Sequence, residues 1–242
     1  MRVAVISDIH SNIAALEAVL GVIGSVDAIW HLGDTVGYGP EPQAVVDRLS
    51  GAGAIGVRGN HDDACAGGDC IEFFNPDGYA AAIWTRAHID GPTRRYLTDL
   101  PERRVLEEWD FTLVHGSPSD PIWEYIDSTA VAAANLAAFE TTYCLVGHTH
   151  VPQAFRESPG GMKAVHLGRL GRLALDDRRL ILNPGSVGQP RDGDPRSSYL
   201  LIDTDAGHAT WHRVEYDIAA TQAAIAAAGL PPRLGRRLSL GR

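Results

Sequence analysis

The chain opens with MRVAVISDIH (residues 1–10), where an apolar run at 3–6 meets a polar segment that contains Asp8 and His10. A short apolar run bounded in this way predicts a buried β-strand. Asn12 is placed to cap the helix that follows. The next predicted elements are a helix at 13–23, a strand at 27–32, a helix at 41–50 and a strand at 54–59. This alternation predicts parallel strands joined by crossover helices, with functional side chains beyond the carboxyl ends of the strands.

The rest of the chain predicts a loop at 62–70 and then a second half that is rich in short strands. Helices are expected at 77–89, 93–100, 129–140 and 217–229. Strands are expected at 103–108, 111–116 and 143–147, and in a series from about 153 to 215. Two halves of this kind favour two sheets packed face to face with helices outside. We therefore predict an α/β fold formed by a single domain, residues 1–242.

Composition limits the function classes. The chain has 242 residues, 45% of them hydrophobic, and its acidic residues exceed its basic residues by 30 to 21, giving a net charge of −9. A protein that binds the nucleic-acid backbone normally has a basic face, so we expect no stable nucleic-acid partner. No apolar stretch has the length of a signal peptide or a membrane span, and three cysteines do not form a disulfide framework. We expect a soluble cytoplasmic protein without a membrane partner.

Five polar motifs follow predicted strands, and each contains or adjoins a glycine. They are SDIH (7–10), LGDTVGYG (32–39), GNHD (59–62), LVHG (113–116) and GHTH (147–150). Their placement puts their side chains at the same end of a sheet. Seven of these side chains are candidate metal ligands: Asp8, His10, Asp34, Asn60, His115, His148 and His150.

The types of these side chains indicate which metals would bind. Oxygen and imidazole ligands together suit Mn, Fe, Zn, Co or Ni, whereas oxygen ligands alone would suggest Mg or Ca. Seven ligands are too many for one ion that must keep an open position. They suit two ions about 3.5–4 Å apart that share a carboxylate.

The ordered motifs Asp-x-His, Gly-Asp-x-x-Gly, Gly-Asn-His-Asp, His-Gly and Gly-His-x-His resemble those of the calcineurin-like metallophosphoesterase superfamily. The resemblance spans residues 1–150. It continues through FNPDGYAAAIWTR (74–86) and NPGSVGQPRDGDPRSSYLLID (183–203), which look like the small bacterial phosphodiesterase branch. It implies a four-layer α-β-β-α sandwich of two mixed sheets, in agreement with the two packed sheets expected above.

The resemblance also implies a role for each residue. One metal would be held by Asp8, His10 and His150. The other would be held by Asn60, His115 and His148, with Asp34 bridging the two ions. His61 would approach the phosphate, where it would protonate the leaving oxygen or stabilise the developing charge. Asp62 would fix the tautomer of His61.

These roles predict hydrolysis of phosphoester bonds by in-line attack of a hydroxide that bridges two divalent transition-metal ions. Mn is the favoured ion, with Fe, Zn, Ni or Co as alternatives. The chain lacks an evident long insertion for an elaborate substrate cap, which favours a phosphodiesterase acting on a small or nucleotide-like substrate. Within the superfamily the alternatives are a phosphomonoesterase, a dinucleoside-polyphosphate hydrolase, a protein phosphatase and a DNA-processing nuclease. A non-enzymatic scaffold is disfavoured because the ligand set and His61 are intact.

Several residues outside the five motifs, or beside the ligands within them, also have expected roles. Substrate contacts are expected from Asn12, Tyr38 and Arg191. Strand alternation turns His31 away from Asp34, so we expect a packed, hydrogen-bonded histidine. Cys65 and Cys70 are expected to be ordinary loop cysteines, with a third metal site or an oxidised pair as the alternatives. The basic tail PPRLGRRLSLGR (231–242) is expected to be a solvated end or a contact within a homo-oligomer.

Overall fold

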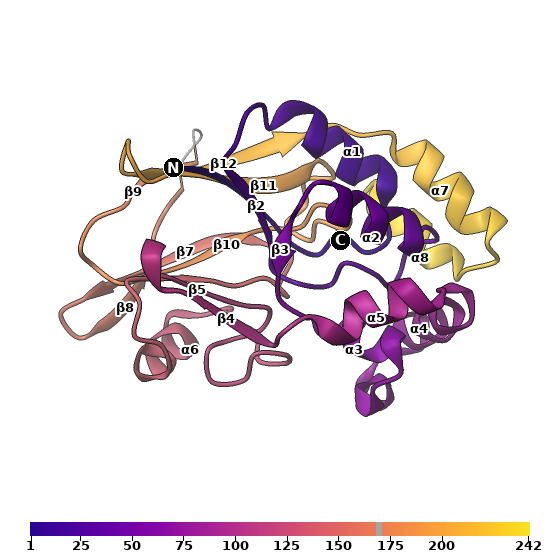
Figure 1. The fold of residues 1–242 in the computed structure, drawn as a ribbon, viewed down its shortest axis with the longest axis horizontal. Coiled ribbons are helices and arrows are strands. Elements are labelled where there is room, and N and C mark those ends of the chain that lie inside the picture. Colours follow the sequence, from indigo (N-terminus) through magenta and orange to yellow (C-terminus); the bar gives the residue numbers. More distant parts are fainter. Residues whose placement is uncertain (168–170) are drawn as a thin grey trace.

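The computed structural model describes residues 1–167 and 171–242, which form two six-stranded mixed sheets packed face to face (Figure 1). The first sheet has the order β3 (Ile55–Gly56), β2 (Ala28–His31), β1 (Arg2–Ile6), β11 (Ser197–Asp203), β12 (His208–Val214) and β9 (Arg172–Ala174). The second has the order β4 (Arg103–Leu106), β5 (Phe111–Val114), β6 (Tyr143–Leu145), β10 (Leu180–Pro184), β7 (Pro152–Ser158) and β8 (Gly161–Ala164). The strands β1, β2 and β3 are parallel, as are β5, β6 and β10, and the remaining pairs are antiparallel. The predicted parallel alternation over the first sixty residues is confirmed.

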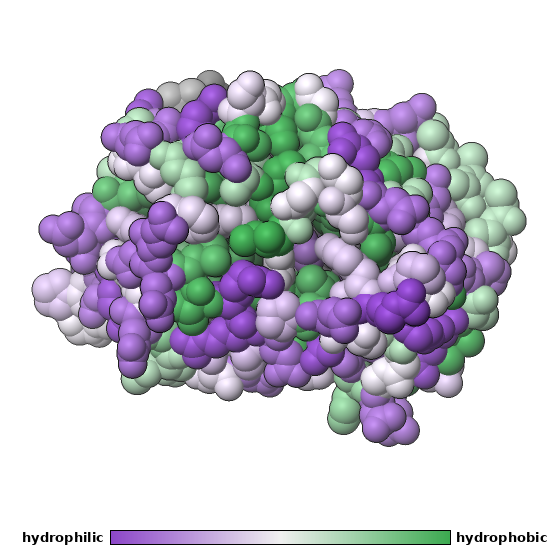
Figure 2. Space-filling model, in the orientation of Figure 1, coloured by the Kyte–Doolittle hydropathy of each residue, from purple (hydrophilic) through white to green (hydrophobic). Residues whose placement is uncertain are grey.

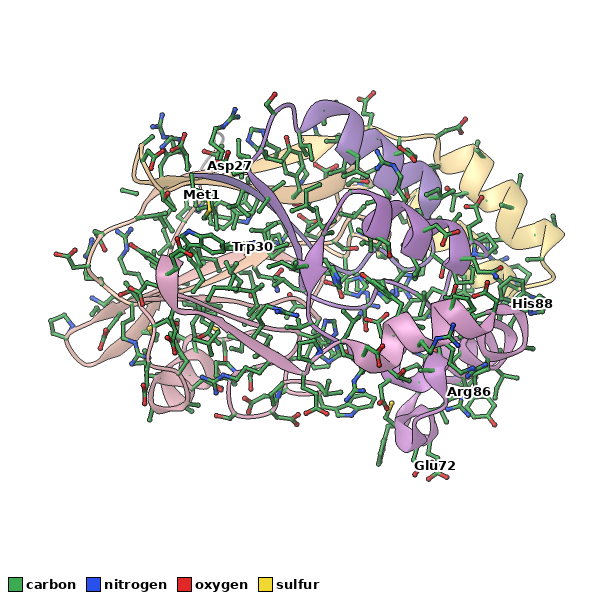
Figure 3. All side chains as sticks on the ribbon, in the orientation of Figure 1. Met1, Asp27, Trp30, Glu72, Arg86 and His88 are labelled. Atoms are coloured by element: carbon green, nitrogen blue, oxygen red, sulfur yellow. The ribbon has the colours of Figure 1, made fainter. Side chains whose placement is uncertain are left out.

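Helices connect the strands. The α-helices are α1 (Ile13–Val22), α2 (Pro42–Gly51), α3 (Asn60–Ala66), α4 (Pro76–His88), α5 (Gly91–Asp99), α6 (Thr129–Ala134), α7 (Ile218–Ala227) and α8 (Pro232–Leu238). The 3-10 turns are η1 (Asp69–Phe73), η2 (Glu107–Trp109) and η3 (Leu136–Ala138). Figure 3 places Glu72 of η1 at the outer end of the segment that projects from the body.

Strand β1 shows how one sequence serves two layers. Side chains alternate between the faces of a strand. Val3 and Val5 therefore pack in the core between the sheets, whereas Ala4 and Ile6 pack beneath α1 and α2. On the outer face of the second sheet, α6 packs against a third apolar cluster. The predicted four-layer α-β-β-α sandwich is confirmed.

Large aromatic side chains fill the space between the sheets. Trp30 of the first sheet is fully buried and packs edge-on against Phe111 of the second, with ring centroids 5.4 Å apart (Figure 3). Figure 2 shows hydrophobic residues gathered near the middle of this face, over the region between the sheets, with hydrophilic residues around them. The packed interior holds the carboxyl ends of both sets of parallel strands in a fixed relation.

Several elements differ from the sequence prediction. The expected loop at 62–70 contains most of α3, whose first turn is closed by a hydrogen bond from Gly59 N to the Asp62 carboxylate (3.1 Å). The helix expected at 129–140 ends at Ala134, and a 3-10 turn follows. The tail expected to be a solvated end instead forms α8, because Pro232 suits a helix start and the apolar pair Leu234 and Leu238 faces inward.

Among the described residues, no helix has both the length and the apolar character needed to cross a membrane.

Candidate metal centre

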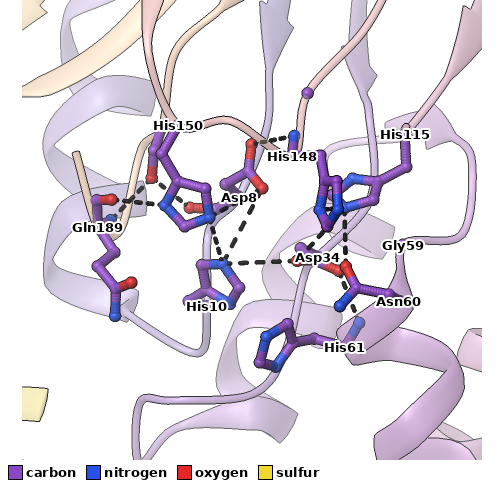
Figure 4. Close-up of polar contacts among 12 residues, drawn as sticks. Asp8, His10, Asp34, Gly59, Asn60, His61, His115, His148, His150 and Gln189 are labelled. Carbon is purple, nitrogen blue, oxygen red and sulfur yellow. Dashed lines mark hydrogen bonds and ion pairs between the residues drawn. The ribbon is translucent and has the colours of Figure 1, made fainter. Parts of the chain in front are cut away.

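The structure brings together all seven candidate ligands beyond the carboxyl ends of five strands (Figure 4). Strand β1 leads to Asp8 and His10, β2 to Asp34, β3 to Asn60, β5 to His115, and β6 to His148 and His150. Parallel strands present these ends at one edge of each sheet, and the face-to-face packing brings the two edges together. All seven side chains are nearly inaccessible to solvent.

The backbone of these residues is held in an unfavourable conformation. Asp8, His10, Asp34, His148 and His150 all have positive φ angles, between 50° and 65°. Each such residue costs on the order of 1–3 kcal/mol and persists only where its surroundings enforce it. Their clustering indicates that the position of the side chains at this edge matters more than local backbone stability.

A first cluster contains Asp8, His10, Asp34 and His150. The Nε2 atoms of His10 and His150 lie 3.2 Å apart. The His150 Nε2 is 3.3 Å from Asp8 Oδ1, and the His10 Nε2 is 3.6 Å from Asp34 Oδ2. Four potential ligand atoms therefore surround one small volume.

A second cluster contains Asp34, His115 and His148. The His115 Nε2 lies 3.0 Å from His148 Nδ1 and 3.4 Å from Asp34 Oδ2. The amide oxygen of Asn60 is 3.1 Å from the same His115 nitrogen. Asp34 Oδ2 thus faces both clusters, which is the position that a bridging carboxylate would occupy.

Main-chain carbonyls orient all four imidazoles. The outward ring nitrogens of His10, His115, His148 and His150 lie 2.6–3.1 Å from the carbonyl oxygens of Val36, Leu32, Trp123 and Gln189, respectively. Since a carbonyl only accepts, each outward nitrogen carries a proton, and a ring that is neutral then directs a lone pair inward. Two inward lone pairs about 3 Å apart repel each other unless a cation lies between them. This arrangement fits a divalent metal in each cluster.

In each of the two carboxylates, Asp8 and Asp34, one oxygen accepts a main-chain hydrogen bond and the other does not. Asp8 Oδ2 accepts the amide of His148 (3.2 Å), and Asp34 Oδ1 accepts the amide of His61 (2.8 Å). Their other oxygens, Asp8 Oδ1 and Asp34 Oδ2, are buried without a hydrogen-bond partner among the described residues. A buried, unpaired carboxylate oxygen is costly. The two oxygens that face the histidines are therefore the ones that need a cation.

Burial dominates the ionisation of the centre. Burial, and also the proximity of Asp34, raises the pKa of Asp8 to about 7. Burial lowers the pKa of His10 and of His148 well below the ordinary value, which leaves them neutral, as metal ligands must be. For His115, burial is outweighed by the Asp34 carboxylate, which raises the pKa to about 9. The Asp34 carboxylate thus favours a positive charge at the position of His115.

His61 lies beside the clusters and belongs to neither. Its ring is 4.3 Å from Tyr38, 4.4 Å from Phe74 and 4.9 Å from His10, measured between centroids, and its Nδ1 has no partner among the described residues. Burial lowers the pKa of His61 to about 4. The ring is therefore neutral near pH 7, and it lines the pocket that opens over the two clusters.

The expected role of Asp62 is wrong. Its carboxylate accepts hydrogen bonds from Thr35 N, Thr35 Oγ1, Val36 N and Gly59 N at 2.7–3.1 Å and makes none with the His61 ring. Asp62 instead ties the loop after Asp34 to the start of α3. It acts on His61 only through the backbone, by fixing two segments of the site to each other.

A pocket opens over the two clusters. Its lining includes the expected substrate contacts Tyr38 and Arg191. It also includes residues that the sequence did not single out: Phe73, Phe74, Asn75, Trp123 and Tyr125. The Tyr125 ring stacks on His148 with centroids 3.8 Å apart. No sequence signal shows that the loop between β5 and α6 returns over the site, so these aromatic residues could not be assigned from spacing.

Asn12 does not line this pocket but an adjoining hollow that it shares with His10 and Tyr38. Its side chain caps α1 by accepting Ala15 N (3.1 Å) and also accepts Thr221 Oγ1 (3.0 Å). Its amide nitrogen donates to Gly188 O (3.0 Å). With only 1% of its surface exposed, Asn12 holds the first loop against α7.

His31 and the cysteines lie outside the two clusters of candidate ligands. His31 is buried and lies 3.0 Å from the Tyr96 hydroxyl, which confirms the packed, hydrogen-bonded interpretation. Cys65, Cys70 and Cys144 are free thiols. The Cys70 thiol donates to the main-chain oxygen of Asn60 (3.4 Å).

Residues 1–207 match the family model described as the calcineurin-like phosphoesterase superfamily domain. The chain belongs to this superfamily. Calcineurin-like phosphoesterases use a dinuclear centre of divalent metal ions, and the two Asp/His clusters are groups that could bind such ions. The chain is accordingly a phosphoester hydrolase.

Similar proteins match most or all of the chain. The crystal structure of a metallophosphoesterase from Sphaerobacter thermophilus is 48% identical, with a TM-score of 0.91, and the match covers 100% of this chain and 99% of that one. An uncharacterized protein of Methanocaldococcus jannaschii is 38% identical over 99% of this chain and 98% of its own length. The phosphodiesterase YfcE of Escherichia coli K12 is 28% identical over 85% of this chain and 89% of its own length.

Proposed function

We propose that this calcineurin-like phosphoesterase is a dimetal phosphodiesterase that acts on small, nucleotide-like substrates. The observation that carries the proposal is the position of Asp34 Oδ2, which is buried, has no hydrogen-bond partner among the described residues and faces both histidine clusters. A single carboxylate oxygen in that position is suited to joining two ions. The relationship to YfcE supports the diesterase branch.

Each ligand has a proposed place. One ion would be held by Asp8, His10 and His150. The other would be held by Asn60, His115 and His148, with Asp34 shared. Bound ions of this kind lower the pKa of a coordinated water to about 7 and offset charge on phosphoryl oxygens. The imidazole-rich set favours Mn, with Fe, Zn, Ni or Co as alternatives, over Mg or Ca.

The residues around the clusters supply the rest of the chemistry. His61 approaches from the Tyr38 and Phe74 side, where the protonated ring would transfer its proton to the leaving oxygen and the neutral ring would donate a hydrogen bond to the phosphoryl group. None of the described residues that line the pocket is Ser, Thr or Cys, which supports water rather than a hydroxyl or thiol of those residues as the nucleophile.

The pocket wall supports a substrate with a flat aromatic group. Phe73 is 78% exposed, and the ring centroids of Phe73 and Phe74 lie 5.8 Å and 5.9 Å from that of Trp123. Exposed aromatic rings beside a phosphate-binding centre suit stacking with a nucleobase, and such stacking contributes about 1–3 kcal/mol per base. A nucleotide-like group on the ester is the class that uses both the centre and this wall.

The function is tested with chromogenic esters and with protein that has been stripped of metal and resupplied with Mn. We expect hydrolysis of bis(4-nitrophenyl) phosphate to exceed that of 4-nitrophenyl phosphate. We also expect a KM at least about fivefold lower for thymidine 5′-(4-nitrophenyl) phosphate than for methyl 4-nitrophenyl phosphate, because stacking of the base favours binding. The leaving group is the same in these two diesters, so the comparison isolates the nucleoside. A preference for the monoester would move the assignment to a phosphomonoesterase.

Metal removal provides a test that does not depend on activity. Metal binding by the native state should raise the free energy of unfolding, because it satisfies Asp8 Oδ1 and Asp34 Oδ2 and separates the facing imidazoles. At 100 times the dissociation constant, one ion contributes about 2.7 kcal/mol. For a chain of this length we expect Mn to raise the unfolding temperature of the metal-free protein by roughly 5–10 °C in calorimetry. An unchanged unfolding temperature with Mn, Fe, Zn, Ni and Co would contradict the proposed centre.

A further inference from the structure

Helix α8 is attached to the wall of the active-site pocket. Its apolar residues Leu234 and Leu238 are buried in a cluster with Tyr38 and with Ile225 of α7. Burying a leucine side chain contributes about 1.5–3 kcal/mol. The helix is therefore a fixed part of the fold, beside α7 and close to the start of α4 (Figure 1). Tyr38 belongs both to this cluster and to the lining of the catalytic pocket.

The polar side of α8 carries a concentration of positive charge. A groove between α8 and the start of α4 is lined by Asn75, Pro76, Asp77, Arg233, Arg236, Arg237, Leu240 and Arg242. We call it the arginine groove. Asp77 lies 3.9 Å from Arg233 Nε. The four arginines of the groove outnumber its single side-chain carboxylate among the described residues, although the chain as a whole has a net charge of −9.

The arginine groove is continuous with the catalytic pocket. Asn75 lines both hollows. The guanidinium carbon of Arg237 lies 5.8 Å from the Tyr38 ring centroid, and that centroid is 4.3 Å from the His61 ring. Arg237 is therefore no more than about 10 Å from His61. This is a short step for a substrate that extends from the metal centre.

Arg191 prolongs the positive charge into the pocket itself. Its guanidinium carbon lies 5.9 Å from the Tyr38 ring, so Tyr38 has an arginine within 6 Å on both the pocket side and the α8 side. Arg191 donates to Gln189 Oε1 (3.0 Å), but its Nε is buried without a partner among the described residues. In Arg237, Nε donates a hydrogen bond to the main-chain oxygen of Arg242, and the other guanidinium nitrogens make no hydrogen bond to a described residue. Arginines in this state have donors left for an anion.

We propose that the arginine groove binds a second phosphate group of the substrate, so that the substrate class is a phosphoester with at least two phosphate groups. This inference rests on the proposed function, because it takes the first phosphate to lie at the dimetal centre. Guanidinium groups bind phosphate oxygens by paired, charge-assisted hydrogen bonds. Asp77 is the only side-chain carboxylate that lines the groove among the described residues.

The test measures binding, which does not depend on hydrolysis. Full-length protein loaded with Mn is titrated calorimetrically with adenosine 3′,5′-bisphosphate and with adenosine 5′-monophosphate. These two ligands differ by one phosphate. We expect the bisphosphate to bind about tenfold more tightly, a difference of about 1.4 kcal/mol that should shrink as NaCl is raised. Arg237→Gln and Arg236→Gln should each remove most of the difference.

Controls separate the arginine groove from general effects. Arg178→Gln removes an exposed arginine that pairs with Asp176 outside the groove, and it should leave the difference between the two nucleotides intact. Arg236 is exposed, so its substitution tests the groove even if Arg237→Gln impairs folding. Equal affinity of the native protein for the two nucleotides would overturn the inference. So would a difference that persists in both groove variants. If the native protein preferred the bisphosphate but did not hydrolyse diesters, the result would count against the proposed function and not against the arginine groove.

Discussion

Replacing Asp34 with asparagine should lower kcat for phosphodiester hydrolysis by at least about a thousandfold, since it removes the charge that both metal positions share. The substitution keeps the shape of the side chain and leaves an oxygen to accept the His61 amide, which Asp34 Oδ1 does at 2.8 Å. What it removes is the anionic Oδ2, which lies 3.6 Å from His10 Nε2 and 3.4 Å from His115 Nε2. The measurement is kcat together with the number of Mn ions bound per chain, which we expect to fall below two.

Asp63→Asn is the matched control for this substitution. Asp63 lies on α3. Unlike that of Asp34, its carboxylate is partly exposed, lies 3.8 Å from Arg58 Nε and belongs to neither cluster. Its substitution should change kcat by less than about twofold, as expected for a loosely paired surface carboxylate. If Asp34→Asn kept two tightly bound ions and near-native kcat, Asp34 would not be the shared ligand.

The sequence was sufficient to predict that the seven candidate ligands lie together, because each one follows a strand. Parallel strands bring their carboxyl ends to one edge, so a motif such as GHTH after β6 needs no long-range information to be placed beside SDIH after β1. The division into two clusters around Asp34 depends on atomic positions. The number of candidate ligands suggested a shared carboxylate and the family resemblance pointed to Asp34, but the direction of Asp34 Oδ2 is visible only in the folded protein.

Residues that reach the site from loops and from the tail could not be placed in this way. Trp123 and Tyr125 follow His115 by eight and ten residues, and their return over the pocket depends on the path of an irregular segment. Arg237 comes from a tail whose basic composition suggested solvation. The apolar pair Leu234 and Leu238 decides its position, because their i,i+4 spacing gives α8 one buried side and leaves the arginines on the side that lines the arginine groove.

Asp62 shows a different limit of sequence reasoning. Its position next to His61 suggested a hydrogen bond between the two side chains. On a helix, however, adjacent residues point in different directions. The Asp62 carboxylate lies at the start of α3, where the amides of Gly59, Thr35 and Val36 are available to it. Adjacency in the chain therefore gave the right neighbourhood and the wrong contact.

Replacing His61 with alanine should lower kcat for a diester with an alkyl alcohol as leaving group by about 10²–10⁴-fold, the usual contribution of a positioned acid. The His61 ring belongs to neither ligand cluster, so the variant should still bind two Mn ions and show a similar metal-dependent rise in unfolding temperature. His88→Ala is the control, because His88 is an exposed histidine at the end of α4 that stacks on Trp84. It should retain native kcat.

The choice of leaving group separates the two roles open to His61. If the imidazole protonates the departing oxygen, the loss in His61→Ala should be large for a diester with an alkyl alcohol as leaving group. It should then be small for 4-nitrophenol, which departs readily as an anion. If His61 instead donates to the phosphoryl oxygen, both esters should lose the same factor. Because His61 lies against Tyr38 and Phe74, on the wall where the ester group would sit, we expect the first pattern. An equal loss for both esters would assign His61 to charge stabilisation.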